Sequence, residues 1–211
     1  MKGTAMKREH RPVQAATIRG FLSAMAAGGM LALLSGCVSL GPKVPDQLIS
    51  LTPAVAAPAG APVGETGKAI LVLAPEADRA IDVQRVPVRI DSASIAYLQD
   101  ALWVERPARQ FRRLVAEAIR AKSGRLVLEG GEAEYAAGET LSGRLLDMGY
   151  DARSRSVIVA YDAIRSSADG TMATRRFTAS VPDVEAKAAP VARALNQAAN
   201  DVAGQVADWV N

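Results

Sequence analysis

Alternating apolar and polar positions occupy much of the second half of the chain and predict strands that bury one face. The continuous apolar segment 69–74 is typical of a central strand. Residues 86–90 alternate around Pro87, which favours an edge or half-buried strand. The pattern predicts six further strands, at 95–98, 102–104, 126–129, 139–150, 156–166 and 171–181.

Polar residues and glycines mark the breaks between these strands. Gln99 and Asp100 are expected to separate two short strands. Asp169 and Gly170 lie between the last two long strands and predict a hairpin turn with positive φ at both residues. The three long strands are therefore expected to form an antiparallel meander.

Two segments repeat their apolar positions every three or four residues, as helices do. Residues 107–122 begin with a proline and are followed by Gly124, which suits the start and the end of a helix. Residues 184–209 carry a long Ala-rich stripe. Pro190 fits only the first turn, so the regular helix is expected to begin near residues 187–189. This order predicts an α+β fold with a single domain, in which two helices pack on one face of a mainly antiparallel sheet.

The N-terminal segment has a different pattern. A basic stretch at residues 2–19 precedes residues 21–34, which are uncharged and mostly apolar, and an LSGC sequence ends at Cys37. This layout is that of a secretory signal. Its ending matches the bacterial lipobox, in which the chain is cleaved between Gly36 and Cys37 and the cysteine is lipidated. An uncleaved membrane helix is less favoured, because the strongly apolar block is shorter than the ~20 residues that a span needs.

The chain is therefore expected to have three parts. Residues 1–36 are the lipoprotein signal peptide, residues 37–67 are the lipidated N-terminus with a tether and a Pro/Ala/Gly-rich linker, and residues 68–211 are the folded domain. Residues 47–52 alternate and could form a first strand. If they pair with the sheet, the linker at 53–67 is a surface loop of the domain. If they do not, the domain starts near Lys68. In either case the linker has little to bury and is expected to be mobile.

Composition excludes several classes of function. The signal peptide holds five of the 25 basic residues and one of the 22 acidic residues, so the remainder, with 20 basic and 21 acidic residues, is nearly neutral. Electrostatic binding to nucleic acid then has no support. The sole histidine, His10, lies in the signal peptide, and Cys37 is the sole cysteine. A catalytic triad and a His/Cys zinc site are thereby excluded, and we expect no cofactor and no metal.

Three features have both a functional and a structural interpretation. Trp103 and Tyr97 are candidate partner contacts, although core packing is favoured for both. The polar face of residues 107–122 could dock acidic lipid or protein, but a solvated helix face is favoured. An acid/base pair or a calcium site is less favoured than an exposed acidic turn for the cluster of Glu129, Glu132, Glu134 and Glu139.

A resemblance to a known family rests on Cys37, residues 48–53, the stretch 97–107 that leads into the first helix, and a final helix that closes with Trp209. The chain resembles the ABC-type transport auxiliary lipoprotein family, which includes the paraquat-inducible protein C lipoproteins. The resemblance implies a noncatalytic role beside a system that moves lipids or hydrophobic compounds between the two membranes. It also implies an ATPase, a permease and an MCE-type periplasmic protein as partners. The residue after Cys37 is Val38 and not Asp. By analogy with proteobacterial lipoproteins, this implies export to the outer membrane, where the domain would face the periplasm.

Three hypotheses follow. The leading one is a lipid-anchored, noncatalytic accessory of a transport system. The second is a structural or assembly lipoprotein of the envelope without a transporter, and the third is a lipid-anchored hydrolase that uses carboxylates alone. The Ala-rich faces of the last helix would allow close packing, either within the domain or between copies in a homo-oligomer.

Overall fold

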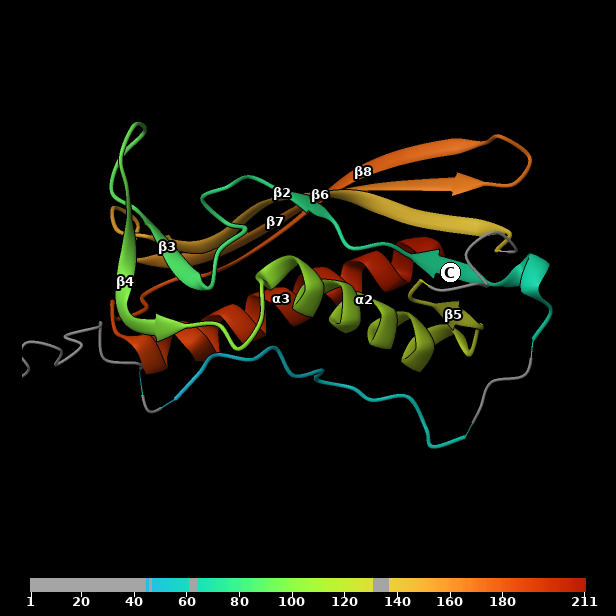
Figure 1. Ribbon diagram of the computed structural model, residues 1–211, viewed down its shortest axis with the longest axis horizontal. Coiled ribbons are helices and arrows are strands. Elements are labelled where there is room, and N and C mark those ends of the chain that lie inside the picture. The colour runs from blue at the N-terminus through green and yellow to red at the C-terminus, as the bar shows by residue number, and fades with distance from the viewer. Residues whose placement is uncertain (1–44, 46, 61–63, 131–136) are drawn as a thin grey trace, which may run out of the picture. The chain divides into compact units, whose positions relative to one another are not determined.

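The structure, a computed structural model, describes residues 45, 47–60, 64–130 and 137–211. The predicted signal peptide, Gly36 and Cys37 lie outside the described residues. The described residues form a single domain in which two helices cover one face of an eight-stranded mixed sheet (Figure 1). The expected α+β fold class is therefore confirmed.

Strand β6 (Glu139–Asp151) organises the sheet because both of its edges are paired. One edge pairs antiparallel with β7 (Ser156–Ser167) over the whole length of β6. The other edge pairs in parallel with three short strands in turn, β1 (Ile70–Val72), β2 (Glu76–Ala77) and β3 (Arg85–Arg89). These parallel ladders were not predicted, because they join segments that lie far apart along the chain.

Two short elements flank the parallel strands. The 3-10 turn η2 (Thr66–Lys68) leads into β1, whose three residues are buried as the apolar pattern predicted. Strand β5 (Val127–Leu128) follows the first helix and pairs in parallel with the other edge of β1. The central position predicted for β1 is therefore confirmed.

Strand β8 (Met172–Val181) pairs antiparallel with β7 and completes the predicted meander. The connecting loop differs from the expected two-residue turn. The Ser167 amide donates to the Thr171 carbonyl at 2.9 Å, which leaves residues 168–170 in the loop, and of these three Gly170 alone has a positive φ, of 87°. A three-residue hairpin loop needs a left-handed residue only at its last position, which glycine supplies.

Strand β4 (Ile95–Leu102) is continuous, so the predicted break at Gln99 and Asp100 is wrong. Asp100 instead adopts a positive φ of 53° within the strand, where the pairing of β3 with β4 shifts register. β3 is also not an edge strand, since it lies between β4 and β6. Its Pro87 is accommodated because the register shift lies beside it and because β6 presents Gly149, whose added Cβ would lie 2.6 Å from the Pro87 carbonyl oxygen.

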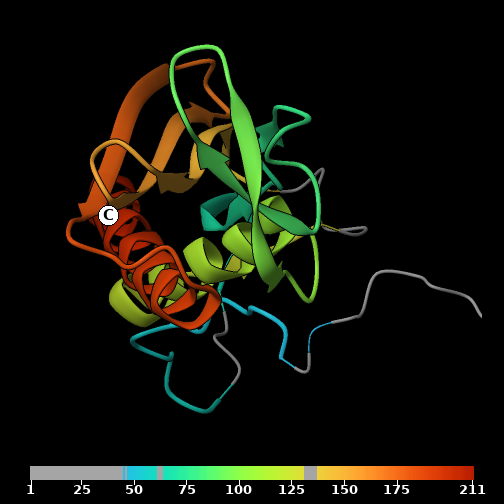
Figure 2. The same cartoon turned by 90° about the vertical axis from the view of Figure 1, so that its left-hand side faces the viewer.

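Helices α2 (Pro107–Ser123) and α3 (Ala188–Val210) match their predicted bounds to within one residue. α2 ends at Gly124, which has a left-handed φ of 63° and donates its amide to the Arg120 carbonyl at 3.2 Å. Pro190 lies in the first turn of α3, where it displaces no helical hydrogen bond. Figure 2 shows both helices on the same side of the sheet.

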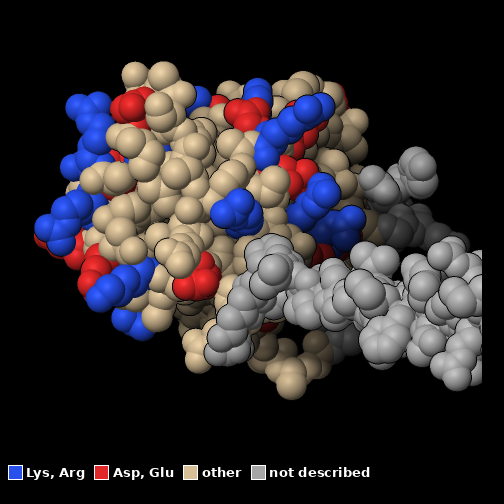
Figure 3. All heavy atoms as spheres, turned by 60° about the vertical axis from the view of Figure 1, so that its left-hand side comes forward, with Lys and Arg blue, Asp and Glu red and all other residues tan. Residues whose placement is uncertain are grey.

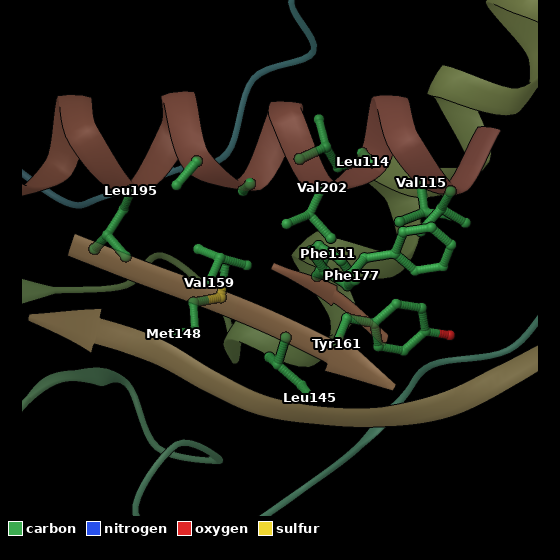
Figure 4. Close-up of a cluster of buried hydrophobic side chains, with 14 of the residues drawn as sticks. Phe111, Leu114, Val115, Leu145, Met148, Val159, Tyr161, Phe177, Leu195 and Val202 are labelled. Carbon is green, nitrogen blue, oxygen red and sulfur yellow. The ribbon is translucent and has the colours of Figure 1, made fainter. Parts of the chain in front are cut away.

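The core lies between the helices and the inner face of β6, β7 and β8 (Figure 4). The edge of the Phe111 ring meets the Tyr161 ring at a centroid distance of 5.2 Å, which joins α2 to β7. Phe177 and Trp209, 5.6 Å apart, join β8 to the end of α3 in the same way. Side chains from all five elements interdigitate there: Phe111, Leu114, Val115, Leu145, Met148, Val159, Tyr161, Phe177, Leu195 and Val202.

Candidate functional site: the tether and its attachment

The chain that follows the predicted anchor enters the domain at Ile49. The Ile49 amide donates to the Leu102 carbonyl at 2.7 Å, and the Val104 amide donates to the Ile49 carbonyl at 2.9 Å. Ile49 is buried and forms a one-residue parallel bridge with Trp103. Residues 47–52 therefore join the sheet at a single residue and do not form the full strand that the alternation suggested.

The next residues run along α2 and α3, as the cyan trace in Figure 1 shows. We call residues 51–57 the strap. Its backbone amides are bound by side chains of the two helices. On α2, Gln110 Oε1 accepts from Leu51 N at 2.9 Å and Glu117 Oε1 accepts from Ala57 N at 2.7 Å. On α3, Asn196 Oδ1 accepts from Thr52 N and Asn200 Oδ1 accepts from Ala54 N, both at 2.7 Å.

The strap corrects the expectation of a mobile linker for residues 53–57. Its proline, alanine and valine side chains are mostly exposed, so it is held by hydrogen bonds to its backbone and little by burial. Asn200 also donates to the Thr52 carbonyl at 2.9 Å, so that both the amide and the carbonyl of Thr52 are hydrogen-bonded to α3. Sequence reasoning missed these four helix residues. The one signal was an asparagine pair, four residues apart, on the polar face of an Ala-rich helix.

The two aromatic candidates lie in different environments. Trp103 is 1% exposed, belongs to the core and has no hydrogen-bond partner for its indole Nε1 among the described residues. Tyr97 is half-buried, and the guanidinium of Arg85 lies 4.7 Å from the centroid of its ring. Tyr97 therefore presents some surface to a partner, whereas Trp103 presents almost none.

The arginines of α2 are matched by carboxylates. Arg113 and Arg109 lie 2.5 Å and 3.7 Å from the Glu105 carboxylate, and the hydrogen bond from Arg113 lowers the pKa of Glu105. Arg120 and Arg112 share Glu129, at 2.7 Å and 3.6 Å. On the face shown in Figure 3, basic side chains likewise lie beside acidic ones. This pattern fits a solvated helix face and leaves little uncompensated charge for an acidic ligand.

The predicted acidic cluster is divided. Glu132 and Glu134 lie outside the described residues. Glu129 pairs with α2, whereas Glu139 begins β6 and accepts hydrogen bonds from Arg125 at 2.6 Å and from Arg165 Nε at 2.7 Å. Burial raises the pKa of Glu139, but these two arginines outweigh it and hold the pKa below its usual range. Within the part of the chain that the structure describes, no three His, Cys, Asp or Glu side chains gather as metal ligands.

A cleft of about 130 Å³ lies where β3 and β4 meet β6. Arg89 Nη2 donates to Asp147 Oδ2 at 2.6 Å in its wall. Burial raises the pKa of Asp147 against the effect of Arg89, whereas hydrogen bonds from Ser154 lower the pKa of the neighbouring Asp151. The cleft is smaller than the ~300 Å³ at which sites for drug-sized molecules begin.

The carboxylates that line this cleft already have partners. Asp78 pairs with Arg144, Asp147 pairs with Arg89, and Asp151 accepts hydrogen bonds from the backbone of the following turn. Hydrolysis by carboxylates requires an acid and a base that face the substrate freely. The hypothesis of a carboxylate hydrolase therefore gains no support from this cleft.

The Ala-rich face of α3 is used inside the domain. Ten of its residues, among them Ala198, Ala199, Val202 and Ala203, are buried against the rest of the domain. In the described residues no helix is both long and apolar enough to cross a membrane.

The family model of the ABC-type transport auxiliary lipoprotein component matches residues 50–207, from the strap almost to the end of α3. The chain belongs to this family. The resemblance noted in the sequence is therefore confirmed. This auxiliary lipoprotein is a component that accompanies an ABC transport system, and its family is lipid-anchored in the cell envelope.

Two of the solved structures that resemble this auxiliary lipoprotein share its fold. Protein XCC0632 from Xanthomonas campestris, a DUF330 protein, has a TM-score of 0.63 and 22% identity, over 78% of this chain and 94% of that one. An uncharacterized protein has a TM-score of 0.61 and 11% identity, over 78% and 100%. The PelC dodecamer from Paraburkholderia phytofirmans has a TM-score of 0.40 and 13% identity, over 72% and 91%. The search of curated proteins found no match.

Proposed function

We propose that this auxiliary lipoprotein is a noncatalytic, lipid-anchored subunit of a system that moves lipids or other hydrophobic compounds across the envelope. Cys37 is the lipidated residue after cleavage between Gly36 and Cys37, and neither a metal nor a cofactor takes part. The family match over residues 50–207 is the observation that carries the proposal. The lipobox at Cys37 supplies the anchor that this family membership calls for.

The attachment of the tether supports an anchoring role. Eleven residue steps separate Cys37 from Leu48, and at about 3.6 Å per extended residue they span at most about 40 Å. Ile49 then enters the core beside Trp103, and the strap binds both helices. A domain tied in this way stays near the membrane, and two or three acyl chains at Cys37 would hold it there stably.

The partners that we propose are an MCE-type periplasmic protein, a permease and an ATPase. The location is the inner leaflet of the outer membrane, facing the periplasm, in keeping with Val38 after the lipidated cysteine. A structural envelope lipoprotein without a transporter is the alternative. Neighbouring genes for the three partners favour transport, and their absence together with a failed crosslink to an MCE-type protein favours the alternative.

The anchor is tested by mass spectrometry of the purified native protein. The expected N-terminal peptide starts at Cys37 and carries acyl mass. Cys37→Ala should lose the acyl mass and keep the signal peptide, whereas the matched variant Ser39→Ala, two residues away, should be processed as the native chain. An intact, lipid-free Met1 peptide in the native protein would contradict the proposal.

The partner is tested by crosslinking in whole cells and pull-down of the intact lipoprotein. We expect the MCE-type protein in the crosslinked material from native cells and a much smaller amount from cells that carry Cys37→Ala. Native mass spectrometry of the same sample reports whether copies of the lipoprotein associate. Recovery of envelope assembly factors alone, without the transporter, would favour the structural alternative.

A further inference from the structure

The free edge of β8 is the largest stretch of backbone in the sheet that pairs with nothing in the described chain. β8 has 10 residues and pairs with β7 alone. It contains no proline, and its pairing with β7 shows no register shift. Natural sheets usually protect such an edge with a proline, a bulge, charged side chains or a covering element, and of the first three β8 has charged side chains alone. In Figure 1 β8 forms the outer border of the meander.

The register identifies which backbone groups face outward. The Ser167 amide donates to the opposite Thr171 carbonyl, so this pair is hydrogen-bonded across the β7–β8 ladder. Hydrogen-bonded pairs recur at every second residue of an antiparallel ladder. The amides and carbonyls that point away from β7 therefore belong to the residues between them, and all five are exposed: Met172, Thr174, Arg176, Thr178 and Ser180.

The charge along this edge is basic. β8 contains Arg175 and Arg176 and no acidic residue. Arg176 binds Asp162 of β7 through two hydrogen bonds, at 2.6 Å and 2.7 Å. Arg175 is exposed and lies over the Phe177 ring at 5.3 Å, and it forms no ion pair with the described residues. A shallow hollow of about 560 Å³ lies over the β7–β8 ladder beside this edge, lined by Thr174, both arginines and the residues of β7 that pair with them.

We propose that the free edge of β8 binds an extended, acidic segment of a partner protein, which adds a strand to the sheet. Main-chain hydrogen bonds to the five outward residues give affinity, as in other cases of strand addition. Carboxylates of the segment pair with Arg175 and compete with Asp162 for Arg176. This docking does not depend on lipidation or on the transported compound.

A second copy of the chain fits the edge less well. A centred antiparallel pairing of two β8 strands places Arg176 of each copy next to Arg176 of the other, and directly opposed or diagonal like charges destabilise a ladder. Arg175 of each copy lies close by on the other face. The two arginines therefore disfavour pairing between two copies of β8 and favour pairing with an acidic strand.

The first test uses the purified full chain in detergent and two ten-residue peptides. One carries adjacent pairs of Glu separated by Val and Thr, so that both of its faces present carboxylates, and the other has Lys in place of each Glu. We expect the Glu peptide to bind at least tenfold more tightly. It should slow amide hydrogen exchange at the five outward residues of β8. Unchanged exchange in β8 at saturating Glu peptide would overturn the proposal, and this measurement needs no variant.

The second test removes one outward amide. Thr178→Pro deletes a donor that β7 does not use, and proline is tolerated at such edge positions. It should weaken binding of the Glu peptide at least tenfold, whereas Thr178→Ala, which keeps the amide, should stay within twofold. Equal thermal unfolding of the two variants shows that the domain is intact. Equal binding by both variants would overturn strand addition.

The third test concerns the charge and the alternative occupant. The double variant Arg175→Glu with Arg176→Glu should prefer the Lys peptide. If protection of β8 instead grows with protein concentration in the absence of peptide, and Thr178→Pro abolishes it, the occupant is a second copy and the proposal is wrong. Failure of the mass-spectrometric test of Cys37 leaves the edge proposal unaffected, so the two can fail separately.

Discussion

β6 and β8 are both long strands on either side of β7, yet they are used differently. β6 is paired on both edges, whereas β8 is paired on one edge within the described chain. Leu141, Leu145 and Met148 of β6 are fully buried, and Phe177 is the one buried residue of β8. The contrast teaches that stability is concentrated in β6, while β8 keeps backbone and charge available for contact.

Gly143→Ala in β6 tests this contrast with the largest expected effect. Gly143 has a φ of 147°, and an added Cβ would overlap the Asp162 carbonyl of β7 and lie 2.9 Å from the Tyr161 ring. Backbone strain costs about 1–3 kcal/mol, and overpacking adds about 1–3 kcal/mol. We expect the free energy of unfolding, measured by urea denaturation, to fall by about 4 kcal/mol.

Gly170→Ala in the β7–β8 loop is the matched control. Gly170 also has a positive φ, but an added Cβ would meet nothing within 4 Å. Only the backbone cost of about 1–2 kcal/mol is expected. If the two variants lost equal free energy of unfolding, the close approach of β6 to β7 at Gly143 would contribute nothing to stability. The contrast between β6 and β8 would then be wrong.

Leu145→Ala and Met172→Ala compare side chains of β6 and β8 directly. Leu145 is completely buried beneath the helices, whereas Met172 is 67% exposed. Truncation of a buried leucine costs about 3 kcal/mol through lost burial and the cavity that it leaves. An exposed truncation changes stability by less than about 0.5 kcal/mol. Thermal and urea unfolding of both variants measure the difference. A loss above about 1 kcal/mol for Met172→Ala would show that the side chains of β8 also stabilise the fold.

The same distinction explains what the sequence could predict. The long strands and both helices were predicted because each repeats its apolar positions over three or more turns or pleats. The fold class followed from those elements, whereas the family followed from the resemblance carried by Cys37, residues 48–53, the stretch 97–107 and Trp209. The parallel pairing of β1, β2 and β3 with β6 could not be read from local periodicity, because it depends on contacts between segments about 60 residues apart or more.

The predictions of a mobile linker at residues 53–57 and of a break in β4 were wrong for related reasons. The strap is fixed by Asn196 and Asn200, more than 140 positions away, and its own Pro/Ala composition reads as a linker. Asp100 interrupts an apolar pattern, yet the strand continues because aspartate tolerates a left-handed backbone. Of the candidate site, the sequence offers Cys37 and Tyr97, while the free edge of β8 emerges only once pairing partners are known.

Glu139→Gln should have a smaller effect than Gly143→Ala and Leu145→Ala, and it adds a pH dependence to the comparison. Glu139 joins the start of β6 to Arg125 and Arg165, whose guanidinium groups also bind the carbonyls of Val210 and Trp209 at the end of α3. Loss of a carboxylate that accepts charged hydrogen bonds costs about 2 kcal/mol at pH 7. The exposed pair of Asp162 with Arg176 supplies the control, Asp162→Asn, with an expected change below about 0.5 kcal/mol.

The sign of the pH dependence follows from the lowered pKa of Glu139. A carboxyl group whose pKa is lower in the folded state than its ordinary value of 4.5 stabilises the fold above that value, and the stabilisation is lost as the pH falls through the folded pKa. The free energy of unfolding of the native protein should therefore exceed that of Glu139→Gln by a constant margin from pH 7 to pH 5, and this margin should shrink at lower pH. Urea unfolding at successive pH values measures it. A margin that persists unchanged to pH 2 would mean that the charge of the Glu139 carboxylate does not stabilise the fold, because the arginines would then bind the protonated carboxyl group equally well.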